Sequence, residues 1–553
     1  MTRRLAALSL LTVLLAACGG QPTASYVGNA SNSSSSEISP LLEGQLESQS
    51  VSSANADIWR KQIIYLVMTD RFSNGNTAND TLGQPNCLDV NNPNKFHGGD
   101  FAGLQSKLGY IKDLGATAVW VTPVYKQVGI VGTSCGYHGY WADYTNPSSS
   151  AVEPKLGTSS NLTSLIDSLH SSTYNMKFIL DMVVNHAGYN ASIVASNPSW
   201  FHPNCSGDDI VCPLAGLPDF RQEDPAVAIY LTDLSKNWAS SYALDSIRMD
   251  TVKHAPMSYW QNSWVPGVNV ARPNMFLLGE AFLDSTASQL KPYYDAGFDS
   301  TFNFPLRSAL VRTIGKGGSV DDLAGKVSDY VGTLGLNRAL LTVNLLDNHD
   351  VGRFINEPGL GVPEVEIRRR YNMGLTTLFT LPGIPQIYYG NELGVYGGND
   401  PDNRKDMPSW AWTDAGRNTA QGGYLGAGTP KATFDLTKRL ASVRTNNPAL
   451  WKGYYAEMWR QNGSGPNVYA FFRGSGINRV IVLVNNGTSA SGTINFPITA
   501  NAGIAQADRD AIKSATFDEQ ANWCSSGIST VTANGSSLGV NIPGQCVLVY
   551  KAR

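Results

Sequence analysis

The stretch SIRMDTVKH, Ser246 to His254, follows a short apolar run and carries the charges from which the rest of the chain can be interpreted. Arg248 and Asp250 lie two residues apart, so on a β-strand their side chains share one face. An arginine beside a carboxylate keeps it ionised and fixes its orientation. At the end of a barrel strand such a carboxylate could act as a nucleophile. A structural ion pair would have the same sequence, so this stretch alone leaves both interpretations open.

Apolar segments of strand length recur along the chain, and most are separated by helical spacing such as that of Leu104, Leu108 and Ile111. Continuous apolar runs of this length are typical of strands buried on both faces. Eight strands alternating with helices, joined by right-handed crossovers, predict an α/β fold, a (β/α)₈ TIM barrel. The eight segments are 63–68, 118–121, 178–180, 243–249, 275–278, 301–304, 340–346 and 384–389.

Three regions lie outside a minimal barrel, which we expect over 58–450. Residues 19–57 are rich in Ser, Asn, Gln and Gly and predict a flexible tether, because they cannot bury enough apolar surface to fold. The segment from about 187 to 221 is too long for an ordinary connection and predicts a small inserted subdomain after the third strand. Short alternating segments between Gly, Asn and Ser turns predict a C-terminal antiparallel β-sandwich over 451–553.

The N-terminus has the features of a targeting segment. Arg3 and Arg4 precede an apolar run that is too short to span a bilayer and ends in LAACG. Residues 1–18 thus resemble a bacterial lipoprotein signal, in which Cys18 is lipidated and becomes the new N-terminus. The alternative is an ordinary secretory signal cleaved near Ala17. Both interpretations place the protein outside the cytoplasm, either lipid-anchored to a bacterial membrane or secreted.

The seven cysteines agree with an oxidising compartment, because six, an even number, remain without Cys18. Zinc is the alternative, but the chain has no CxxC pair, which disfavours it. Two pairs are close in sequence and the third follows by elimination. The expected disulfides are Cys205–Cys212, Cys524–Cys546 and Cys87–Cys135. A formal net charge of −3 with 15 % charged residues gives no indication of a nucleic-acid partner.

Polar residues follow the predicted strands at the rim where a barrel enzyme has its active site. Asp70 follows the first strand, DMVVNH ends the third, Glu280 follows the fifth and DNHD the seventh. Among these residues, the carboxylates Asp250, Glu280 and Asp350 come together on one rim with two histidines and Arg248. An aspartate at a strand end often caps the next helix. Capping explains single members of this set, but not several buried like charges together.

These segments resemble the diagnostic motifs of the α-amylase family, glycoside hydrolase family 13, in order and at compatible spacing. The resemblance covers about Asp57 to the C-terminus, and Ser246 departs from it because the family usually has glycine there. The four main motifs are DMVVNH (181–186), SIRMDTVKH (246–254), LLGEAF (277–282) and LLDNHD (345–350). The supporting motifs are LPDF (217–220), GYHGYW (136–141) and GIPQIYYGNE (383–392).

The resemblance implies a retaining mechanism through a covalent glycosyl-enzyme. Asp250 would be the nucleophile and Glu280 the general acid/base, with carboxyls about 5–5.5 Å apart and pKa values pushed apart. Asp350 would hold the sugar hydroxyls most strongly in the distorted transition state. A structural role is the alternative for the histidines. The implied substrate-binding residues are Arg248, His186, His349, His138, Tyr140, Trp141, Lys253, His254, Asp402 and Arg404.

The resemblance also implies structural calcium, which prefers oxygen ligands. A first site would use Asn185, Asp219 and the carbonyls of His254 and Ile210. A second would lie in SNGNTAND (73–80) and HGGD (97–100), which resemble the N-terminal calcium loop of cyclodextrin glucanotransferases. Its implied ligands are Asn74, Asn76, Asn79, Asp80, Gly98 and Asp100. A metal-free turn rich in Asn and Asp is the alternative for this second loop.

The activity that the resemblance implies is endo-hydrolysis of α-1,4-glucosidic bonds in starch, glycogen or maltodextrins, by a monomer outside the cell. A transglycosylase on the same scaffold, like cyclodextrin glucanotransferase or 4-α-glucanotransferase, is the first alternative. The second is a glucan-binding surface protein without catalysis. The presence of Asp250, Glu280 and Asp350 together argues against the second alternative.

Overall fold

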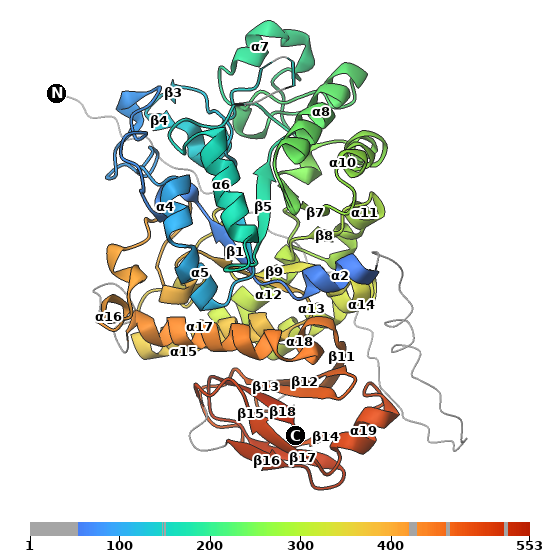
Figure 1. The fold of residues 1–553 in the computed structure, drawn as a ribbon. Helices are drawn as coiled ribbons and strands as arrows, with labels where there is room; N and C mark the ends of the chain where they lie inside the picture. The colour runs from blue at the N-terminus through green and yellow to red at the C-terminus, as the bar shows by residue number, and fades with distance from the viewer. Residues whose placement is uncertain (1–52, 146, 149–150, 420–428, 461–464, 525–528) are drawn as a thin grey trace, which may run out of the picture. The chain divides into compact units, whose positions relative to one another are not determined.

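The computed structural model describes residues 53–145, 147–148, 151–419, 429–460, 465–524 and 529–553 (Figure 1). All of them belong to one compact unit, Ile38–Arg553. The predicted signal and all but the last five residues of the predicted tether lie outside the described residues. Among the described residues, no helix has both the length and the apolar character needed to cross a membrane.

Eight parallel strands form the barrel, in the order β8-β7-β6-β5-β2-β1-β10-β9. A parallel bridge between Phe302 and Val343 joins the two ends of this sheet. All eight predicted strands are present, which confirms the predicted fold class. The strands are β1 Ile64–Val67, β2 Ala118–Val121, β5 Lys177–Met182, β6 Ser246–Met249, β7 Phe276–Gly279, β8 Ser300–Thr301, β9 Val343–Leu345 and β10 Ile384–Tyr388.

Helices surround the barrel (Figure 1). Up to β6 they are α2 Ser53–Arg60, α3 Thr69–Phe72, α4 Phe101–Ser106, α5 Leu108–Leu114, α6 Ser159–His170 and α8 Pro225–Ser241. Between β6 and β9 they are α9 Met257–Tyr259, α10 Val265–Ala271, α11 Lys291–Asp295, α12 Phe304–Leu310, α13 Val320–Leu334 and α14 Leu336–Ala339. After β9 they are α15 Glu364–Thr380, α16 Asp414–Arg417, α17 Pro430–Thr445 and α18 Pro448–Lys452.

Three local differences from the sequence expectations have physical causes. Helix α2 begins inside the predicted tether, because Trp59 is buried and stacks on Phe276 with ring centroids 4.2 Å apart. The helix expected around Leu108 is two helices, since Lys107 between α4 and α5 leaves helical geometry. Strand β8 is short because Asn303 caps α12 through its side chain.

The segment between β5 and α8 contains α7 Ser192–Ser196 in the expected insert, and the loop after β2 contains β3 Ile130–Val131 and β4 Ser134–Cys135. Beyond the barrel, the chain forms an antiparallel sheet of six strands and a pair, β14-β17, around one apolar core. This confirms the predicted all-β domain. Its elements are β11 Tyr454–Arg460, β12 Val468–Ser475, β13 Asn478–Asn485, β14 Thr493–Pro497, α19 Gln506–Ile512, β15 Thr516–Glu519, β16 Thr530–Thr532, β17 Ser537–Asn541 and β18 Cys546–Ala552.

Side chains of the all-β domain bond directly to the barrel helices. Arg473 of β12 is fully buried and donates to the carbonyl of Thr380 at the end of α15, at 2.9 Å. Asn486 donates to the carbonyl of Thr313 at 2.7 Å. The three expected disulfides, Cys87–Cys135, Cys205–Cys212 and Cys524–Cys546, are all formed.

Candidate active site

A cleft of about 550 Å³ opens at the carboxyl ends of the barrel strands. Asp250 follows β6 and Glu280 follows β7, so the topology of the sheet brings their side chains to the same end of the barrel. Asp350 follows β9 and lines the same cleft. The lining residues are Tyr140, Trp141, His186, Tyr189, Leu214, Ala215, Leu217, Asp250, Thr251, Lys253, His254, Glu280, Phe282 and Asp350.

Arg248 lies beneath the cleft and contacts three carboxylates. Its Nη1 lies 2.5 Å from Oδ1 of Asp250 and 2.9 Å from Oδ1 of Asp181, and its Nη2 lies 3.7 Å from Oε1 of Glu280. The side chain is fully buried, and its guanidinium lies over the ring of Trp120, 5.2 Å from the ring centroid. Although burial opposes it, the charges of Asp181 and Asp250 raise the pKa of Arg248 above its ordinary value. A permanent cation therefore lies between the acidic groups.

Glu280 is held for a role different from that of Asp250. Its Oε2 accepts a hydrogen bond from the backbone N–H of Thr251 at 3.1 Å, and its side chain is 6 % exposed. Burial raises the pKa of Glu280 well above its usual range; Arg248 opposes this, and the charges of Asp250 and Asp350 add to it. Asp250 instead forms the shortest of the three ion pairs of Arg248. The two carboxyl groups therefore lie in different surroundings.

Asp350 also lines the cleft, with its side chain 32 % exposed. Its Oδ2 lies 3.3 Å from Nε2 of His349, and its Oδ1 lies 3.7 Å from Nη2 of Arg404. The Nε2 of His349 also lies 2.6 Å from the hydroxyl of Tyr140. Burial, with the nearby cations, lowers the pKa of His349 well below its ordinary value, so its imidazole is neutral. Asp350, His349 and Arg404 therefore form one connected group.

Asp181 and Trp120 support the site from inside the barrel, and sequence reasoning gave neither a functional role. Besides its bond with Arg248, Asp181 accepts hydrogen bonds from Trp120 Nε1 at 3.0 Å and from the Tyr140 hydroxyl at 2.8 Å. Burial raises the pKa of Asp181 to about 7, while the charge of Arg248 opposes the shift. A carboxylate buried in an apolar strand needs hydrogen-bond partners. Asp181 within the strand KFILDM was therefore the sequence signal that could have revealed this supporting role.

The structure distributes the other expected substrate-binding residues unevenly. Lys253 and His254 line the cleft and also reach the inserted segment: Lys253 Nζ lies 3.2 Å from Oδ2 of Asp209, and His254 Nδ1 lies 2.8 Å from its carbonyl. His186 and Trp141 line the cleft wall as expected. Asp402 is 58 % exposed, pairs with Lys405 and accepts the N–H of Gly398, so the structure does not bring it to the cleft.

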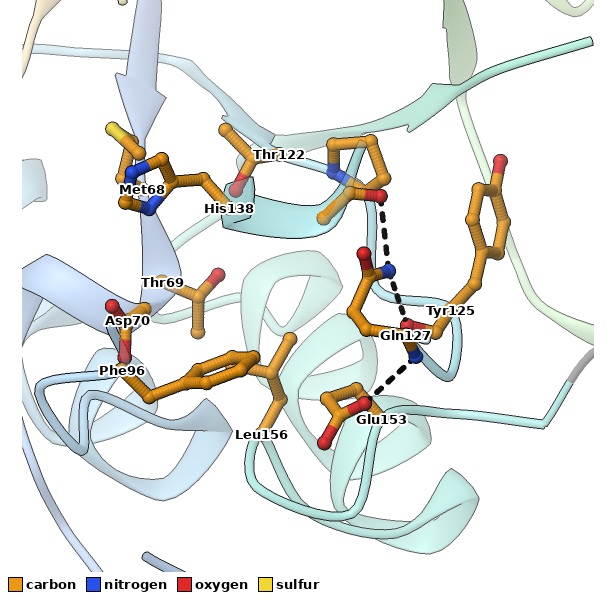
Figure 2. Close-up of a pocket in the computed structure, with 12 residues that line it drawn as sticks. Met68, Thr69, Asp70, Phe96, Thr122, Tyr125, Gln127, His138, Glu153 and Leu156 are labelled. Carbon is orange, nitrogen blue, oxygen red and sulfur yellow. Dashed lines mark hydrogen bonds between the residues drawn. The ribbon is translucent and has the colours of Figure 1, made fainter. Parts of the chain in front are cut away.

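His138 lies in a separate small cavity of about 10 Å³, which has room for about one water molecule. Figure 2 shows its ring beside Met68 and the Thr69–Asp70 segment. Its Nδ1 lies 3.4 Å from Nη2 of Arg71, and burial, with that cation, lowers the pKa of His138 well below its ordinary value. His138 is therefore a neutral, buried side chain and does not line the described cleft.

The first expected calcium site has donors that fit a hard cation. A backbone bridge between His186 and Asp219 sets Asn185 beside Asp219. The amide Oδ1 of Asn185 is buried and has no hydrogen-bond partner among the described residues. An orphaned buried oxygen beside a carboxylate is a donor set that Ca²⁺ prefers. Ile210 follows Asp209, whose carbonyl oxygen lies 2.8 Å from Nδ1 of His254. The expected ligands Ile210 and His254 therefore lie in the same part of the structure.

The second expected site is also assembled by the fold. Asp100 caps α4 and accepts the N–H groups of Gly75 and Asn76 at 3.0 and 2.8 Å, and Asn79 Nδ2 donates to it at 3.2 Å. The Oδ1 of Asn79 is buried and has no hydrogen-bond partner among the described residues. Asn74 donates to both carboxylate oxygens of Asp80, beside Gly98.

Within the described part of the chain, no three or more His, Cys, Asp or Glu side chains are grouped so that they could hold a metal ion. The two calcium sites expected from the sequence rely mainly on amide and backbone oxygens, which are donors of another kind.

Most of the chain matches known family models. Residues 66–204 and 210–453 match the family model of the α-amylase catalytic domain, and residues 459–553 match that of the α-amylase C-terminal all-β domain. The chain is 32 % identical over 462 residues to the β/α-amylase of Paenibacillus polymyxa, covering 78 % of this chain and 34 % of that protein.

Two further relatives cover similar parts of the chain. It is 30 % identical over 484 residues to the cyclomaltodextrin glucanotransferase of Geobacillus stearothermophilus, covering 79 % of this chain and 61 % of that enzyme. The crystal structure of α-amylase from Geobacillus thermoleovorans complexed with acarbose superposes with a TM-score of 0.72 at 28 % identity, covering 90 % of this chain and 99 % of that one. The chain thus spans about a third of the first relative's length and 61 % of the second's.

Proposed function

The chain belongs to the α-amylase family, and from this premise we propose that it is an extracellular, retaining endo-hydrolase of α-1,4-glucosidic bonds in starch, glycogen or maltodextrins. The observation that carries the proposal is the arrangement of Asp250 and Glu280 on one guanidinium, that of Arg248. Hydrolysis with retention needs an ionised nucleophile and a protonated acid on either side of one glycosidic bond. The short ion pair with Arg248 suits the nucleophile, and the burial that raises the pKa of Glu280 suits the acid.

The first chemical step forms a covalent bond between the protein and the sugar. A carboxylate oxygen of Asp250 attacks the anomeric carbon while the bond from that carbon to the glycosidic oxygen breaks. Glu280 transfers its proton to the departing oxygen, so the leaving chain departs as a neutral alcohol. Arg248 orients Asp250 throughout, because their ion pair is buried and short.

The second step releases the sugar and restores both acids. Glu280, now a carboxylate, takes a proton from water, whose oxygen attacks the anomeric carbon as the bond to Asp250 breaks. Asp350 lines the same cleft as Glu280, with His349 beside it, and it can bind sugar hydroxyls most strongly in the distorted transition state. If a sugar hydroxyl replaces water, the same step is transglycosylation, the first alternative activity.

Calcium would be held by Asn185, Asp219 and the carbonyls of Ile210 and His254, and at a second site around Asn79. Bound calcium would supply positive charge that fastens the inserted segment to the barrel beside the cleft. The chain's own contacts already join these parts through Asp209 and His254.

The N-terminal features support a further proposal, that the protein is anchored outside the cytoplasm by a lipid on Cys18. Labelling of producing cells with a radioactive fatty acid tests it: label in the wild-type protein that is absent from Cys18→Ser supports the anchor. A secreted, unlabelled protein would support the ordinary signal instead.

A time course of products from soluble starch tests the enzymatic proposal. Short linear maltooligosaccharides, released as mixed lengths from the start with the α-configuration at the new reducing end, are expected. Cyclic or lengthened glucans would show transglycosylation, and no products at all would favour a binding protein. Glu280→Gln serves as the comparison with strongly reduced activity, and Asp233→Asn, at a half-exposed position on α8, as the matched control.

A further inference from the structure

The disulfide Cys205–Cys212 closes a small loop of the inserted segment, which we call the disulfide ring (residues 205–212). The two cysteines are seven residues apart in the sequence. Within the ring, Oδ1 of Asp208 accepts the N–H groups of Ile210 and Val211 at 2.7 and 3.2 Å. A covalent closure and a turn held by a side chain leave the backbone between them few alternative conformations.

Asp209, inside the disulfide ring, contacts two residues that line the active-site cleft. Its Oδ2 lies 3.2 Å from Nζ of Lys253, and its backbone carbonyl lies 2.8 Å from Nδ1 of His254. A carbonyl oxygen can only accept a hydrogen bond, so Nδ1 of His254 carries the hydrogen, and in the neutral imidazole Nε2 is then the acceptor. One residue of the insert thus orients two neighbouring side chains of the cleft.

Lys253 needs a partner of this kind to have a defined position. Its ammonium group ends a flexible stem of four carbons, which allows it many positions, and its side chain is 24 % exposed. The side chain of Asp209 is 67 % exposed, so the ion pair adds little to the stability of the fold. Its effect is to restrict the ammonium group of Lys253 to the side of the cleft that the insert lines.

The disulfide ring also leads directly into a wall of the cleft. The ring ends at Cys212, and the cleft-lining residues Leu214, Ala215 and Leu217 follow within five residues. The hydroxyl of Tyr189, which also lines the cleft, donates to the carbonyl of Ala215 at 2.5 Å. The wall is therefore held at Ala215 by Tyr189 and at its start by the disulfide.

The turn that carries Lys253 and His254 also contacts the proposed acid. The N–H of Thr251 donates to Oε2 of Glu280 at 3.1 Å, and the N–H of Val252 donates to the carbonyl of Glu280 at 3.0 Å. In the proposed reaction Glu280 protonates the oxygen of the departing chain. This turn therefore lies beside the leaving-group part of the substrate.

We propose that the disulfide ring determines how the cleft holds the leaving-group part of the glucan, with Asp209 as a positioning residue that sets Lys253 and His254 against the sugars beyond the cleaved bond. The inference rests on the proposed function, which supplies the substrate and the direction of cleavage. The two proposed reacting carboxyls are held separately, by the buried guanidinium beneath the cleft. A change in the ring should therefore alter which bond is cleaved, and not the chemistry of cleavage.

Cleavage of maltoheptaose labelled at its reducing end tests the inference, because the label stays on the leaving-group part. Asp209→Asn removes the charge that faces Lys253. We expect kcat/KM to fall about 1.5- to 5-fold, as for the loss of an exposed ion pair. Labelled products should become shorter, because binding modes with fewer sugars on the leaving-group side then compete better.

A substrate with an aryl leaving group has no sugar on that side, so Asp209→Asn should leave its kcat/KM unchanged. Asp208→Asn is the matched control: it removes the same charge from the same ring and keeps an oxygen that can accept the N–H groups of Ile210 and Val211. It should change neither kcat/KM nor the product lengths. All assays contain excess calcium, so that loss of a bound ion does not enter the comparison.

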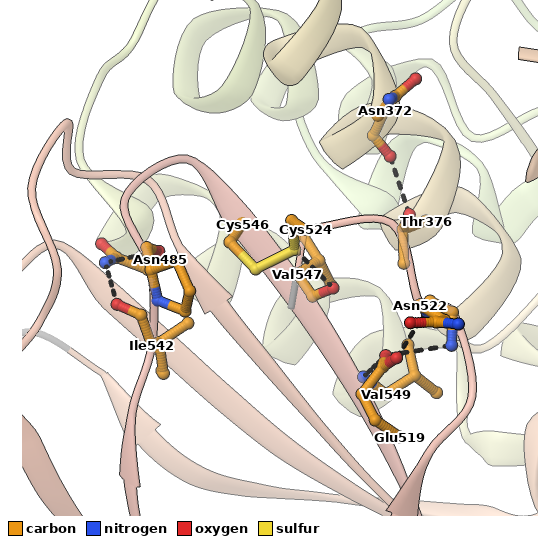
Figure 3. The surroundings of a disulfide bond; sticks show 12 residues. Asn372, Thr376, Asn485, Glu519, Asn522, Cys524, Ile542, Cys546, Val547 and Val549 are labelled. Carbon is orange, nitrogen blue, oxygen red and sulfur yellow. Dashed lines mark hydrogen bonds between the residues drawn. A yellow bond between two sulfur atoms is a disulfide. The ribbon is translucent and has the colours of Figure 1, made fainter. Parts of the chain in front are cut away.

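Opening the disulfide ring tests the role of its closure. Cys205→Ser combined with Cys212→Ser loosens both contacts of Asp209 and should shorten the labelled products further than Asp209→Asn does. The control is Cys524→Ser combined with Cys546→Ser. Figure 3 shows that disulfide beside β18 in the all-β domain, and none of the residues labelled there lines the cleft. Its loss should lower the unfolding midpoint and leave the product lengths unchanged.

Labelled products of wild-type length from both Asp209→Asn and the opened ring would overturn the inference. An equal fall in kcat/KM on the aryl substrate would overturn it too, because the ring would then act on the reacting carboxyls. If the opened ring does not fold, Asp209→Asn and its control decide alone. If the wild type cleaves neither substrate, the proposed function itself fails.

Discussion

The guanidinium of Arg248 donates a hydrogen bond of 2.5 Å to Asp250, two residues further along the chain. Strand β6 sets the two side chains on one face, and Trp120 covers the guanidinium from below. Because the pair is buried, loss of either partner would leave an unpaired charge in an apolar setting. The same guanidinium reaches Glu280 at 3.7 Å, so one cation fixes the positions of both proposed reacting groups.

The proposed acid role of Glu280 predicts a dependence on the leaving group. Glu280→Gln cannot protonate the departing oxygen, and general acid catalysis contributes about 10²- to 10⁴-fold. We expect a loss of that size in kcat/KM on maltooligosaccharides. With an aryl leaving group that departs without protonation, the first step should be nearly normal, so glycosyl-enzyme should accumulate in a burst. If kcat/KM falls equally on maltooligosaccharides and on the aryl substrate, while the unfolding midpoint stays unchanged, the acid role is contradicted.

The raised pKa of Glu280 predicts the alkaline limb of the pH profile. The reaction needs protonated Glu280, so activity should be lost as the pH rises through its pKa. Burial raises that pKa well above the ordinary glutamate value of about 4.3. We therefore expect kcat/KM on maltooligosaccharides to stay high through mildly acidic pH and to decline only at higher pH. A decline centred near the ordinary glutamate pKa would contradict this assignment, as would an alkaline limb unchanged in the residual activity of Glu280→Gln.

How far the sequence predicted this site depends on what kind of residue is considered. Asp250 and Glu280 follow strands directly and Asp350 comes five residues after β9, so counting strands was enough to bring them to one rim. The roles of Asp181 and Trp120 could not be predicted in the same way. Trp120 lies inside a strand that pattern alone marks as core and Asp181 lies at the end of the neighbouring strand, and only the folded sheet shows that their side chains meet. Asp402 is a different case: it lies in an exposed turn, where local partners decide its direction, and it does not line the described cleft.

The hydrogen bond from Trp120 to Asp181 predicts that Trp120 is a positioning residue. Trp120→Phe keeps an aromatic ring over Arg248 but removes the donor to Asp181. A hydrogen bond to a charged group contributes about 1.5–3 kcal/mol, so the free energy of unfolding should fall by that amount. Displacement of Arg248 should lower kcat by about 10- to 100-fold while KM changes little. Trp459→Phe, at an exposed tryptophan, is the control, and a change confined to stability would leave Trp120 with a structural role only.

The orphaned oxygen of Asn185 predicts calcium-dependent stability. Calcium at 100 times its Kd should stabilise the native protein by about 2.7 kcal/mol, since binding shifts the folding equilibrium by mass action. A chelator should therefore lower the thermal unfolding midpoint of the wild type. Asn185→Ala should lose most of this calcium response, whereas Asn190→Ala, in the loop beyond it, should keep it. A midpoint that the chelator leaves unchanged would argue for metal-free loops.

Gly98 predicts how closely the second calcium loop is packed. Its φ is +91°, and a Cβ at this position would lie 2.5 Å from Nδ2 of Asn74 and 3.0 Å from Oδ1 of Asp80. Gly98→Ala should therefore disrupt the bond between Asn74 and Asp80 as well as strain the backbone. Gly83→Ala is a matched control, because its φ is +76° but a Cβ there would meet nothing within 4 Å. The control isolates the backbone strain, about 1–2 kcal/mol.

We expect Gly98→Ala to lower the unfolding midpoint more than Gly83→Ala does, and to shrink the part of the midpoint that responds to calcium. If calcium binds this loop, the response falls because Asn74 and Asp80 can no longer approach each other across Gly98. If the unfolding midpoint falls equally in the two variants, the loop around Gly98 can rearrange to accommodate the extra methyl group. A larger loss in Gly98→Ala with an unchanged calcium response would identify a metal-free turn, in which the bonds of Asp100 alone hold the loop.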